Sequence, residues 1–348
     1  MNQPGETTTY RAPAEEARHR CTWQCWASNP AIYQHDTAYF EDVQQIIARL
    51  ASAISEHEPV YMLVGEDQSG LARELCTNRV QLVNIPTDDM WARDSGPVFL
   101  KQTDGNTATL TLNFNGWGDK IEHGIDQYVA PRLVDHLGYP PVLTDLVGEG
   151  GGIEFDGEGT LLLTDSCWLN SNRNPDWTQD AIEHELRRNL GVEKVIWLPG
   201  VRNQDDTDGH IDGAVRFVRP GVIMTSGFTD DGSDWADVLN ESIGILQYET
   251  DARGRGFEIT HIPAAENPRS QHPNFFTSYA NFYVGNGAVY TPEFGDTFAD
   301  GRAQSILSAL FPGRQVVPLN VDRIYENGGG IHCVTQRTPL VAQVYDRI

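Results

Sequence analysis

Hydrophobic positions in this chain follow two periods, one near 3.6 residues and one of two residues. Apolar side chains three or four positions apart predict a helix over residues 36–55, and they are Val43, Ile47, Leu50 and Ile54. A continuous apolar run predicts a buried strand at Pro59–Val64. A short helix near residues 70–77 and a strand at Val80–Val83 are expected to follow.

From residue 97 onward, a succession of two strands, a helix and a third strand recurs four times. The paired strands are predicted at 97–101 with 107–114, 152–155 with 160–164, 210–218 with 221–226, and 279–284 with 287–291. The helix and third strand of each unit are predicted at 126–137 with 142–145, 182–190 with 194–198, 239–246 with 257–262, and 306–310 with 315–319. Two last strands, 331–336 and 340–345, lack a helix, and the N-terminal helix and strand would complete their unit.

A repeat of roughly 50–70 residues whose two ends meet is typical of a closed ring. Because one unit cannot bury its apolar face alone, the units must share a core. We therefore predict an α/β fold of five such units around a central pocket, with one domain over residues 13–348. Residues 1–12 are expected to be disordered.

The formal net charge of −24 makes nucleic acid and anionic membrane surfaces poor partners, whereas a small cationic substrate would be attracted. No run of about 18 apolar residues predicts a transmembrane helix. The first twenty residues are polar and include acids, unlike a signal peptide, which favours the cytoplasm. The acidic, lysine-poor composition suits a salt-rich cytoplasm. The alternative is that acidic residues accumulated by ordinary evolutionary drift. The sequence leaves open whether the protein forms a homo-oligomer.

The ring has a consequence for the chemistry. Its units begin at Asp94–Pro97, Glu149–Gly151, Gly209–Asp212, Ser278–Asn281 and Gly330–Cys333. Because equivalent positions in a ring converge on its axis, we expect five side chains to share one pocket, namely Asp94, Glu149, His210, Asp212 and Cys333. His210 and Asp212 lie two apart on a predicted strand and would share a face.

Structural roles compete with this interpretation. Cys333 follows a glycine-rich stretch near the start of a predicted strand, where a buried thiol in a turn is the alternative. Asp94 would then merely pair with Arg93, and His210 with Asp212 would lie on a surface strand. The acids at Asp205–Asp208 suggest a cation site, but their spacing differs from a calcium-binding loop. The five cysteines show neither a disulfide framework nor a zinc motif, so we predict no metal and no cofactor.

Clustered carboxylates, a histidine and a thiol fit one substrate group, the guanidinium. Carboxylates grip this planar cation through paired hydrogen bonds. Its resonance-stabilised carbon requires a strong nucleophile, and a bound cation would lower the pKa of a nearby thiol. A histidine can protonate the departing ammonia and then activate water.

The chain resembles the agmatine deiminase family, which also contains bacterial peptidyl-arginine-deiminase-like proteins. The resemblance is carried by WARDSGP (91–97), FNGWG (114–118), EGG (149–151), DGEGTLL (156–162), NRNP (172–175), DTDGHID (206–212) and GGGIHC (328–333). It implies the pentein fold, a five-bladed α/β propeller. It also implies hydrolysis of a guanidino group, in this family agmatine to N-carbamoylputrescine and ammonia through a covalent thiouronium intermediate.

Carried over by the resemblance, Cys333 is the nucleophile and His210 the general acid and base. Glu149 assists at the guanidinium, while Asp94 and Asp212 bind its nitrogens. Trp91 and Trp117 would wall the pocket. Asp206 stands near the far amine of the substrate, where agmatine enzymes commonly have Glu, and Ala92, Gly116 and Arg337 also depart from the common family residues. Free or peptidyl arginine, or another guanidino compound, is therefore an alternative substrate, and a non-catalytic or metal-binding propeller is an alternative of another class.

Overall fold

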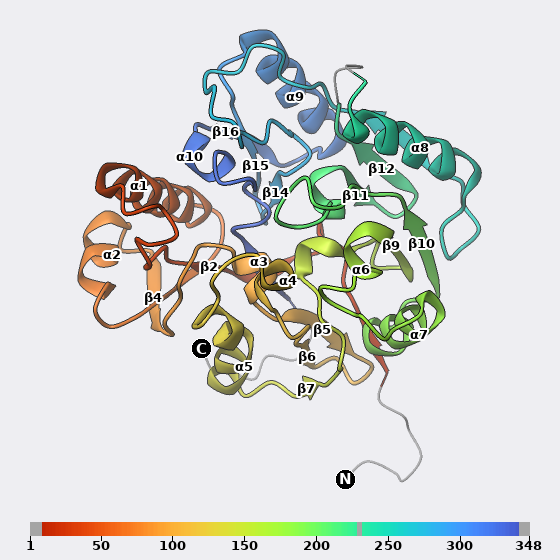
Figure 1. The fold of residues 1–348 in the computed structure, drawn as a ribbon, viewed down its shortest axis with the longest axis horizontal. Helices are drawn as coiled ribbons and strands as arrows, with labels where there is room; N and C mark the ends of the chain where they lie inside the picture. Colours follow the sequence, from red (N-terminus) through yellow and green to blue (C-terminus); the bar gives the residue numbers. More distant parts are fainter. Residues whose placement is uncertain (1–8, 228–231, 341–348) are drawn as a thin grey trace.

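The computed structural model describes residues 9–227 and 232–340. Within these residues the strands form five separate sheets of three or four strands each. Figure 1 shows the sheets arranged around a common centre, with the long helices on the outside. The predicted ring of five α/β units is confirmed.

The sheets share one connectivity, which the second sheet illustrates. Strand β8 (Glu154–Phe155) pairs antiparallel with β9 (Thr160–Thr164), and β10 (Lys194–Leu198) then joins β9 in parallel. Helix α7 (Gln179–Leu190) makes the crossover that a parallel pair requires. Thr178 caps this helix through its side chain, and Gly191 ends it in the left-handed conformation.

Three other sheets repeat this order. The first contains β5 (Val98–Gln102), β6 (Thr107–Leu110), α5 (Val129–Leu137) and β7 (Pro141–Val142). The third contains β11 (Val215–Arg219), β12 (Val222–Thr225), α8 (Asp234–Tyr248) and β13 (Glu258–His261), and the fourth contains β14 (Tyr283–Val284), β15 (Ala288–Pro292), α9 (Thr297–Leu310) and β16 (Gln315–Leu319). Most of the predicted elements are thus present, although several strands are shorter than the sequence suggested.

The fifth sheet joins the two ends of the chain. Strand β17 (Gln336–Pro339) pairs antiparallel with β2 (His19–Cys25), a strand that the sequence analysis did not predict. The sheet continues through α1 (Thr37–Ile54), β3 (Val60–Val64), α2 (Ser69–Leu75) and β4 (Val80–Asn84). The N-terminal segment therefore completes the last unit as expected. The predicted strand 340–345 lies almost wholly outside the described residues.

The start of the chain requires a correction. Tyr10–Arg11 form strand β1, which pairs antiparallel with β5, and the side chain of Ala12 is buried. The expectation of disorder is therefore wrong for residues 10–12, because pairing and burial fix them. Residues 1–8 lie outside the described residues. One domain over 13–348 stays a prediction.

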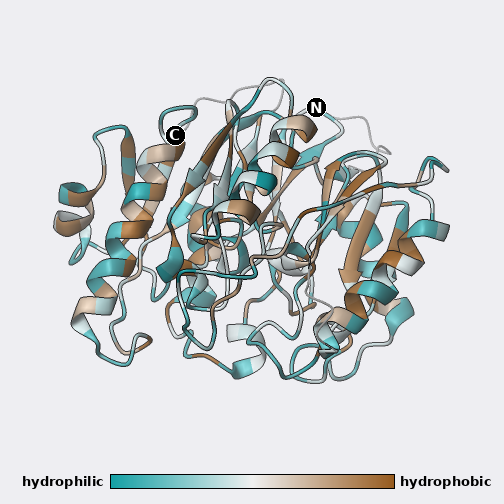
Figure 2. Ribbon diagram, turned by 90° about the horizontal axis from the view of Figure 1, so that it is seen from above, coloured by the Kyte–Doolittle hydropathy of each residue, from teal (hydrophilic) through white to brown (hydrophobic). Residues whose placement is uncertain are grey.

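Hydrophobic cores lie between neighbouring units. Trp23 of β2, Phe99 of β5 and Leu133 of α5 belong to one buried cluster, while Leu162 of β9 and Phe217 of β11 belong to another. Figure 2 shows strands inside the molecule that are largely hydrophobic and outer helices banded with both characters. Full burial of one such side chain is worth about 1.5–3 kcal/mol. No helix in the described part of the chain is both long and apolar enough to cross a membrane.

Short helical segments, rather than strands, carry several residues that line the central cavity: Asp94 in α3 (Ala92–Ser95), Trp117 in α4 (Gly116–Asp119), Asp212 in η3 (Ile211–Gly213) and Arg323 in α10 (Asp322–Tyr325). Segment η2 (Gly150–Gly152) packs against α3 and η3. Two expectations are corrected here. His210 and Asp212 lie at a 3-10 turn and not on a strand, and residues 331–334 form a turn before β17. Because the chain forms a 3-10 turn before β11, the side chains of His210 and Asp212 line the central cavity.

Candidate active site

A cavity of about 650 Å³ opens at the centre of the ring. Its walls include seven of the eight predicted site residues, namely Trp91, Asp94, Trp117, Asp206, His210, Asp212 and Cys333. The eighth, Glu149, is fully buried and contacts His210 from behind. Residues separated by more than 200 positions in the sequence thus meet at one place, as the ring predicted.

The Cys333 thiol is held from two sides. Asn281 Nδ2 lies 3.3 Å from Sγ, and Asp212 Oδ2 lies 3.6 Å from it. The backbone carbonyl of Cys333 accepts a hydrogen bond from the Arg93 N–H at 3.0 Å. Burial, followed by the charges of Asp212 and Asp94, raises the pKa of the thiol well above its ordinary value. Without a cation in the cavity, the thiol is therefore protonated.

His210 is positioned by a buried carboxylate. Its Nε2 lies 3.2 Å from Glu149 Oε2, and its Nδ1 lies 3.8 Å from Asp94 Oδ2. Within the described residues, Nδ1 has no hydrogen-bond partner. Burial opposes the charged ring, but Asp94 and hydrogen bonds with Cys167 and Glu149 raise the pKa of His210 well above its ordinary value. The ring therefore carries a proton and presents it on the free nitrogen.

Asp94 and Asp212 face the cavity but differ in electrostatics. Asp94 accepts hydrogen bonds from Gly151 N–H at 2.9 Å and Trp117 Nε1 at 3.0 Å, yet burial raises its pKa. Burial acts to raise the pKa of Asp212, but the His332 hydrogen bond at 2.6 Å and the charges of His332, His210 and Arg216 together outweigh it and bring the pKa to about 2. Asp212 is thus firmly ionised before substrate binds.

Gly151 marks the point where these charged groups converge. A Cβ built on this glycine would lie 2.6 Å from His210 Nδ1, 3.0 Å from Asp94 Oδ1 and 3.1 Å from Asp212 Oδ2. No side chain fits among the three groups. Because Gly151 has no side chain, the space between His210 and the two carboxylates stays free.

Two indoles shape the wall of the cavity. The rings of Trp91 and Trp117 meet edge to face with centroids 6.4 Å apart, and Trp91 Nε1 donates to Asp89 Oδ2 at 2.9 Å. Trp117 has a φ of +57°, a strained value for this residue, in the short α4 segment. Both side chains are buried, so their faces offer an apolar, π-rich lining beside the carboxylates.

Asp206 lies at an exposed part of the cavity wall, on a loop that a lysine fixes. Lys120 Nζ donates to the carbonyl oxygens of Asp205 and Asp206 at 3.0 and 3.1 Å and pairs with Asp208 Oδ1 at 2.8 Å. Partial burial, followed by the charge of Asp205, raises the pKa of Asp206. Its carboxylate therefore favours a cationic neighbour.

The Porphyromonas-type peptidyl-arginine deiminase family matches residues 11–339 of the chain. The chain belongs to this family. A putative agmatine deiminase of Streptomyces coelicolor is 37% identical over 340 residues, covering 95% of this chain and 99% of the relative. An agmatine deiminase of Medicago truncatula is 35% identical over 367 residues, covering 95% and 97%.

Solved structures agree with the family. The agmatine deiminase of Enterococcus faecalis superimposes with a TM-score of 0.88 at 28% identity, covering 95% of this chain and 96% of that one. The pentein fold expected from the sequence is confirmed by this likeness. The resemblance to the agmatine deiminases, seen first in seven short motifs, extends along nearly the whole chain.

Three further residues of this peptidyl-arginine deiminase family member complete the site, and the sequence analysis did not single them out. Arg173 Nε donates to both oxygens of Glu149 at 2.8 and 3.0 Å, Cys167 Sγ lies 3.7 Å from Glu149 Oε2, and Asn281 contacts Cys333. Arg173 lies within the NRNP motif. Asn281 lies at the start of the fourth unit, so the ring argument, applied to every unit, would have found it.

The structural alternatives for single residues fare differently. Arg93 pairs with Glu15 at 2.8 Å rather than with Asp94, so that alternative is wrong. Both carboxylate oxygens of Asp208 form ion pairs, Oδ1 with Lys120 and Oδ2 with Arg173, so neither is free to bind a metal cation. Cys333 does lie in a turn and is buried, but its thiol reaches the cavity.

Proposed function

We propose that the protein is a cysteine-dependent hydrolase that deiminates agmatine, giving N-carbamoylputrescine and ammonia. The observation that carries this proposal is the meeting of a protonated histidine and two carboxylates around the absent side chain of Gly151, in a cavity whose wall also holds the Cys333 thiol, 3.6 Å from Asp212 Oδ2. Relatives named agmatine deiminase that cover nearly the whole chain support it.

Substrate binding comes first in the proposed mechanism. Asp94 and Asp212 hold the nitrogens of the guanidinium, while Trp91 and Trp117 close off its faces. The bound cation offsets the two negative charges that oppose a thiolate at Cys333. The substrate thus promotes ionisation of the nucleophile that attacks it, and the thiol proton leaves to the solvent through the open cavity.

Chemistry then proceeds in two halves. The Cys333 sulfur bonds to the guanidinium carbon, and one C–N bond breaks as His210 donates its Nδ1 proton, so ammonia leaves and a thiouronium remains. Water then adds to the same carbon while His210 takes one of its protons. The C–S bond then breaks and the remaining hydroxyl proton passes to the sulfur, which restores the Cys333 thiol and leaves a ureido group on the product. Glu149 holds His210 for both transfers.

A metal-dependent reaction is less consistent with the geometry. Among the described residues, Glu149, Cys167 and His210 have donor atoms within 4.8 Å of one another, a set that would suit a metal ion. However, Arg173 donates to both Glu149 oxygens, so a metal cation would lie beside a guanidinium. We therefore assign His210 to proton transfer and Glu149 to holding it, rather than either residue to metal binding.

Arginine is the second candidate substrate, because the family is named for peptidyl-arginine deimination. Free arginine carries a carboxylate that Asp205 and Asp206 would repel, which favours agmatine. The deciding experiment measures ammonia release from agmatine, arginine, a blocked arginyl peptide and other guanidino compounds. Release from agmatine that iodoacetamide abolishes and EDTA leaves unchanged is expected. No release from any of these compounds would contradict the proposal.

The cytoplasm is the compartment we propose. The five cysteines lie in the described residues, all buried and unpaired, and the reaction requires Cys333 to stay reduced. Expression of a tagged protein followed by cell fractionation would test the assignment.

A further inference from the structure

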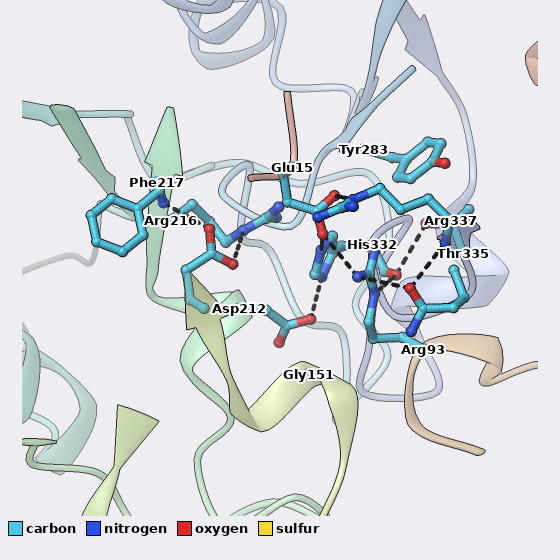
Figure 3. A network of polar contacts seen from close by, with 12 residues as sticks. Glu15, Arg93, Gly151, Asp212, Arg216, Phe217, Tyr283, His332, Thr335 and Arg337 are labelled. Atoms are coloured by element: carbon cyan, nitrogen blue, oxygen red, sulfur yellow. Dashed lines mark hydrogen bonds and ion pairs between the residues drawn. The ribbon is translucent and has the colours of Figure 1, made fainter. Parts of the chain in front are cut away.

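A chain of polar contacts runs from the cavity to the N-terminal segment. Figure 3 shows that contacts lead from Asp212 through His332 to Glu15, with Arg93 and Arg337 beside Glu15. His332 precedes the proposed nucleophile and is almost completely buried. The proposed mechanism gives His332 no role, although it links Asp212 to Glu15.

Both ring nitrogens of His332 face carboxylate oxygens. Nδ1 lies 2.6 Å from Asp212 Oδ2, and Nε2 lies 3.2 Å from Glu15 Oε1. A neutral imidazole has only one N–H, so it would turn a lone pair toward one of the two anions. The ring makes both contacts as hydrogen bonds only when both nitrogens carry hydrogen.

Glu15 is itself fixed as an anion. Its Oε1 accepts from Arg93 Nη1 at 2.8 Å, and its Oε2 accepts from Arg337 Nε at 2.8 Å. Burial acts to raise the pKa of Glu15, but Arg337 and Arg93 outweigh it and hold the pKa well below the ordinary value. Nε2 of His332 therefore faces an ionised carboxylate, which can only accept a hydrogen bond from it.

Asp212 needs such a partner because a second carboxylate and the proposed nucleophile lie beside it. Asp94 from α3 faces the same point at Gly151, and the Cys333 sulfur lies 3.6 Å away. His210, beside the same 3-10 turn, and Arg216 on β11 supply positive charge, but Arg216 is already paired with Glu154. His332 donates the closest hydrogen bond to Asp212.

We propose that His332 is a positioning residue that keeps Asp212 ionised and oriented for the guanidinium, and that Glu15 keeps His332 charged. The inference rests on the proposed deiminase function. It adds a segment near the N-terminus to the set of residues that govern catalysis. Arg93 strengthens the link, because its backbone N–H binds the Cys333 carbonyl at 3.0 Å and its side chain binds Glu15.

The first test is the pH profile of kcat/KM for agmatine. In His332→Gln, Asp212 loses its charged partner while its burial remains, so its pKa rises from about 2 past that of Asp94, and the pH below which activity falls moves upward. We expect a shift of about one pH unit or more, and a loss of at least about tenfold at neutral pH. Glu15→Gln should act in the same direction but less strongly.

His19→Gln is the matched control. His19 is also buried; its Nδ1 lies 3.0 Å from Glu58 Oε1 and its Nε2 lies 3.1 Å from the Glu15 carbonyl oxygen, but it has no contact with Asp212. Its loss should lower the melting temperature without moving the acid limb. A folded His332→Gln enzyme whose acid limb coincides with that of the wild type would overturn the proposal.

A second measurement separates this inference from the proposed function. Imidazole ¹⁵N signals of the wild type, assigned to His332 through their absence in the Gln variant or by selective labelling, should show both nitrogens bonded to hydrogen at neutral pH. A neutral tautomer would refute the relay even if agmatine is turned over. If the wild type released no ammonia, the proposed function would fail, and the ¹⁵N signals would still decide whether His332 is charged.

Discussion

Asn281 Nδ2 lies 3.3 Å from the sulfur of Cys333, although 52 residues separate the two in the chain. The amide oxygen of the same side chain, Asn281 Oδ1, accepts a hydrogen bond from the backbone N–H of His332 at 2.9 Å. Asn281 therefore fixes both the turn that carries the thiol and the thiol itself. The fourth unit supports the nucleophile of the fifth, which makes reactivity a property of the closed ring.

Replacement of Cys333 by Ser should leave the fold intact and abolish turnover. The two side chains have similar volumes, but a hydroxyl is far harder to ionise than a thiol. Mass spectrometry of the wild type during turnover should reveal an adduct of the substrate mass minus ammonia, absent in the variant. Full activity in the Ser variant would exclude Cys333 as the nucleophile.

Alkylation of Cys333 in the free enzyme should be slow at neutral pH. Because burial, Asp212 and Asp94 raise its pKa, the thiolate fraction and the iodoacetamide rate should still be rising with pH above about 8.5, the ordinary thiol value. The rate is measured by mass spectrometry across pH, with Cys333→Ser as the background. A rate that levels off below pH 8 would show that the thiol ionises readily without substrate.

Asp94→Asn and Asp212→Asn should each weaken guanidinium capture. Loss of one charged, bidentate partner is expected to cost on the order of 2–4 kcal/mol in kcat/KM. Asp156→Asn is the control, because Asp156 is buried and accepts backbone N–H groups of its own turn, outside the cavity. Wild-type kinetics in both cavity variants would mean that the two carboxylates are structural.

Gly151→Ala should reduce kcat/KM at least about a hundredfold, since displacement of catalytic groups by about 1 Å has effects of this size. The added methyl would occupy the point where His210, Asp94 and Asp212 meet. Gly301→Ala is the control, because a Cβ there, on helix α9, meets no atom within 4 Å. If Gly151→Ala and Gly301→Ala were equally active, the convergence at Gly151 would not matter for catalysis.

Asp206→Ala should lower kcat/KM for agmatine on the order of 1 kcal/mol, about fivefold, through loss of a partly solvated ion pair with the distal amine. Butylguanidine, which has no second amine, serves as the control substrate and should be unaffected. Arginine should be a poorer substrate than agmatine for the wild type. A wild type that prefers arginine, or an Asp206→Ala variant with unchanged values for agmatine, would refute this account of specificity.

The sequence by itself determined the repeating units and the chemistry that they bring together. Periods of 3.6 and two residues depend on local geometry and survive in any context, so α1, α7 and β9 could be located from their residues alone. Glycine-rich starts of units and the acids, histidine and cysteine beside them then predicted the cavity, because a closed ring forces equivalent positions together.

Only the tertiary structure decided how those groups are charged and held. His210 and Asp212 were expected on a strand because alternation cannot reveal where a 3-10 turn replaces strand geometry. Strand β2, although buried, was missed, and its partner β17 lies more than 300 residues away. Glu15, Arg173 and Asn281 act through contacts between distant segments, and these contacts set the pKa values of the site. Local pattern encodes which elements form, whereas desolvation and charge pairing arise only when the ring closes.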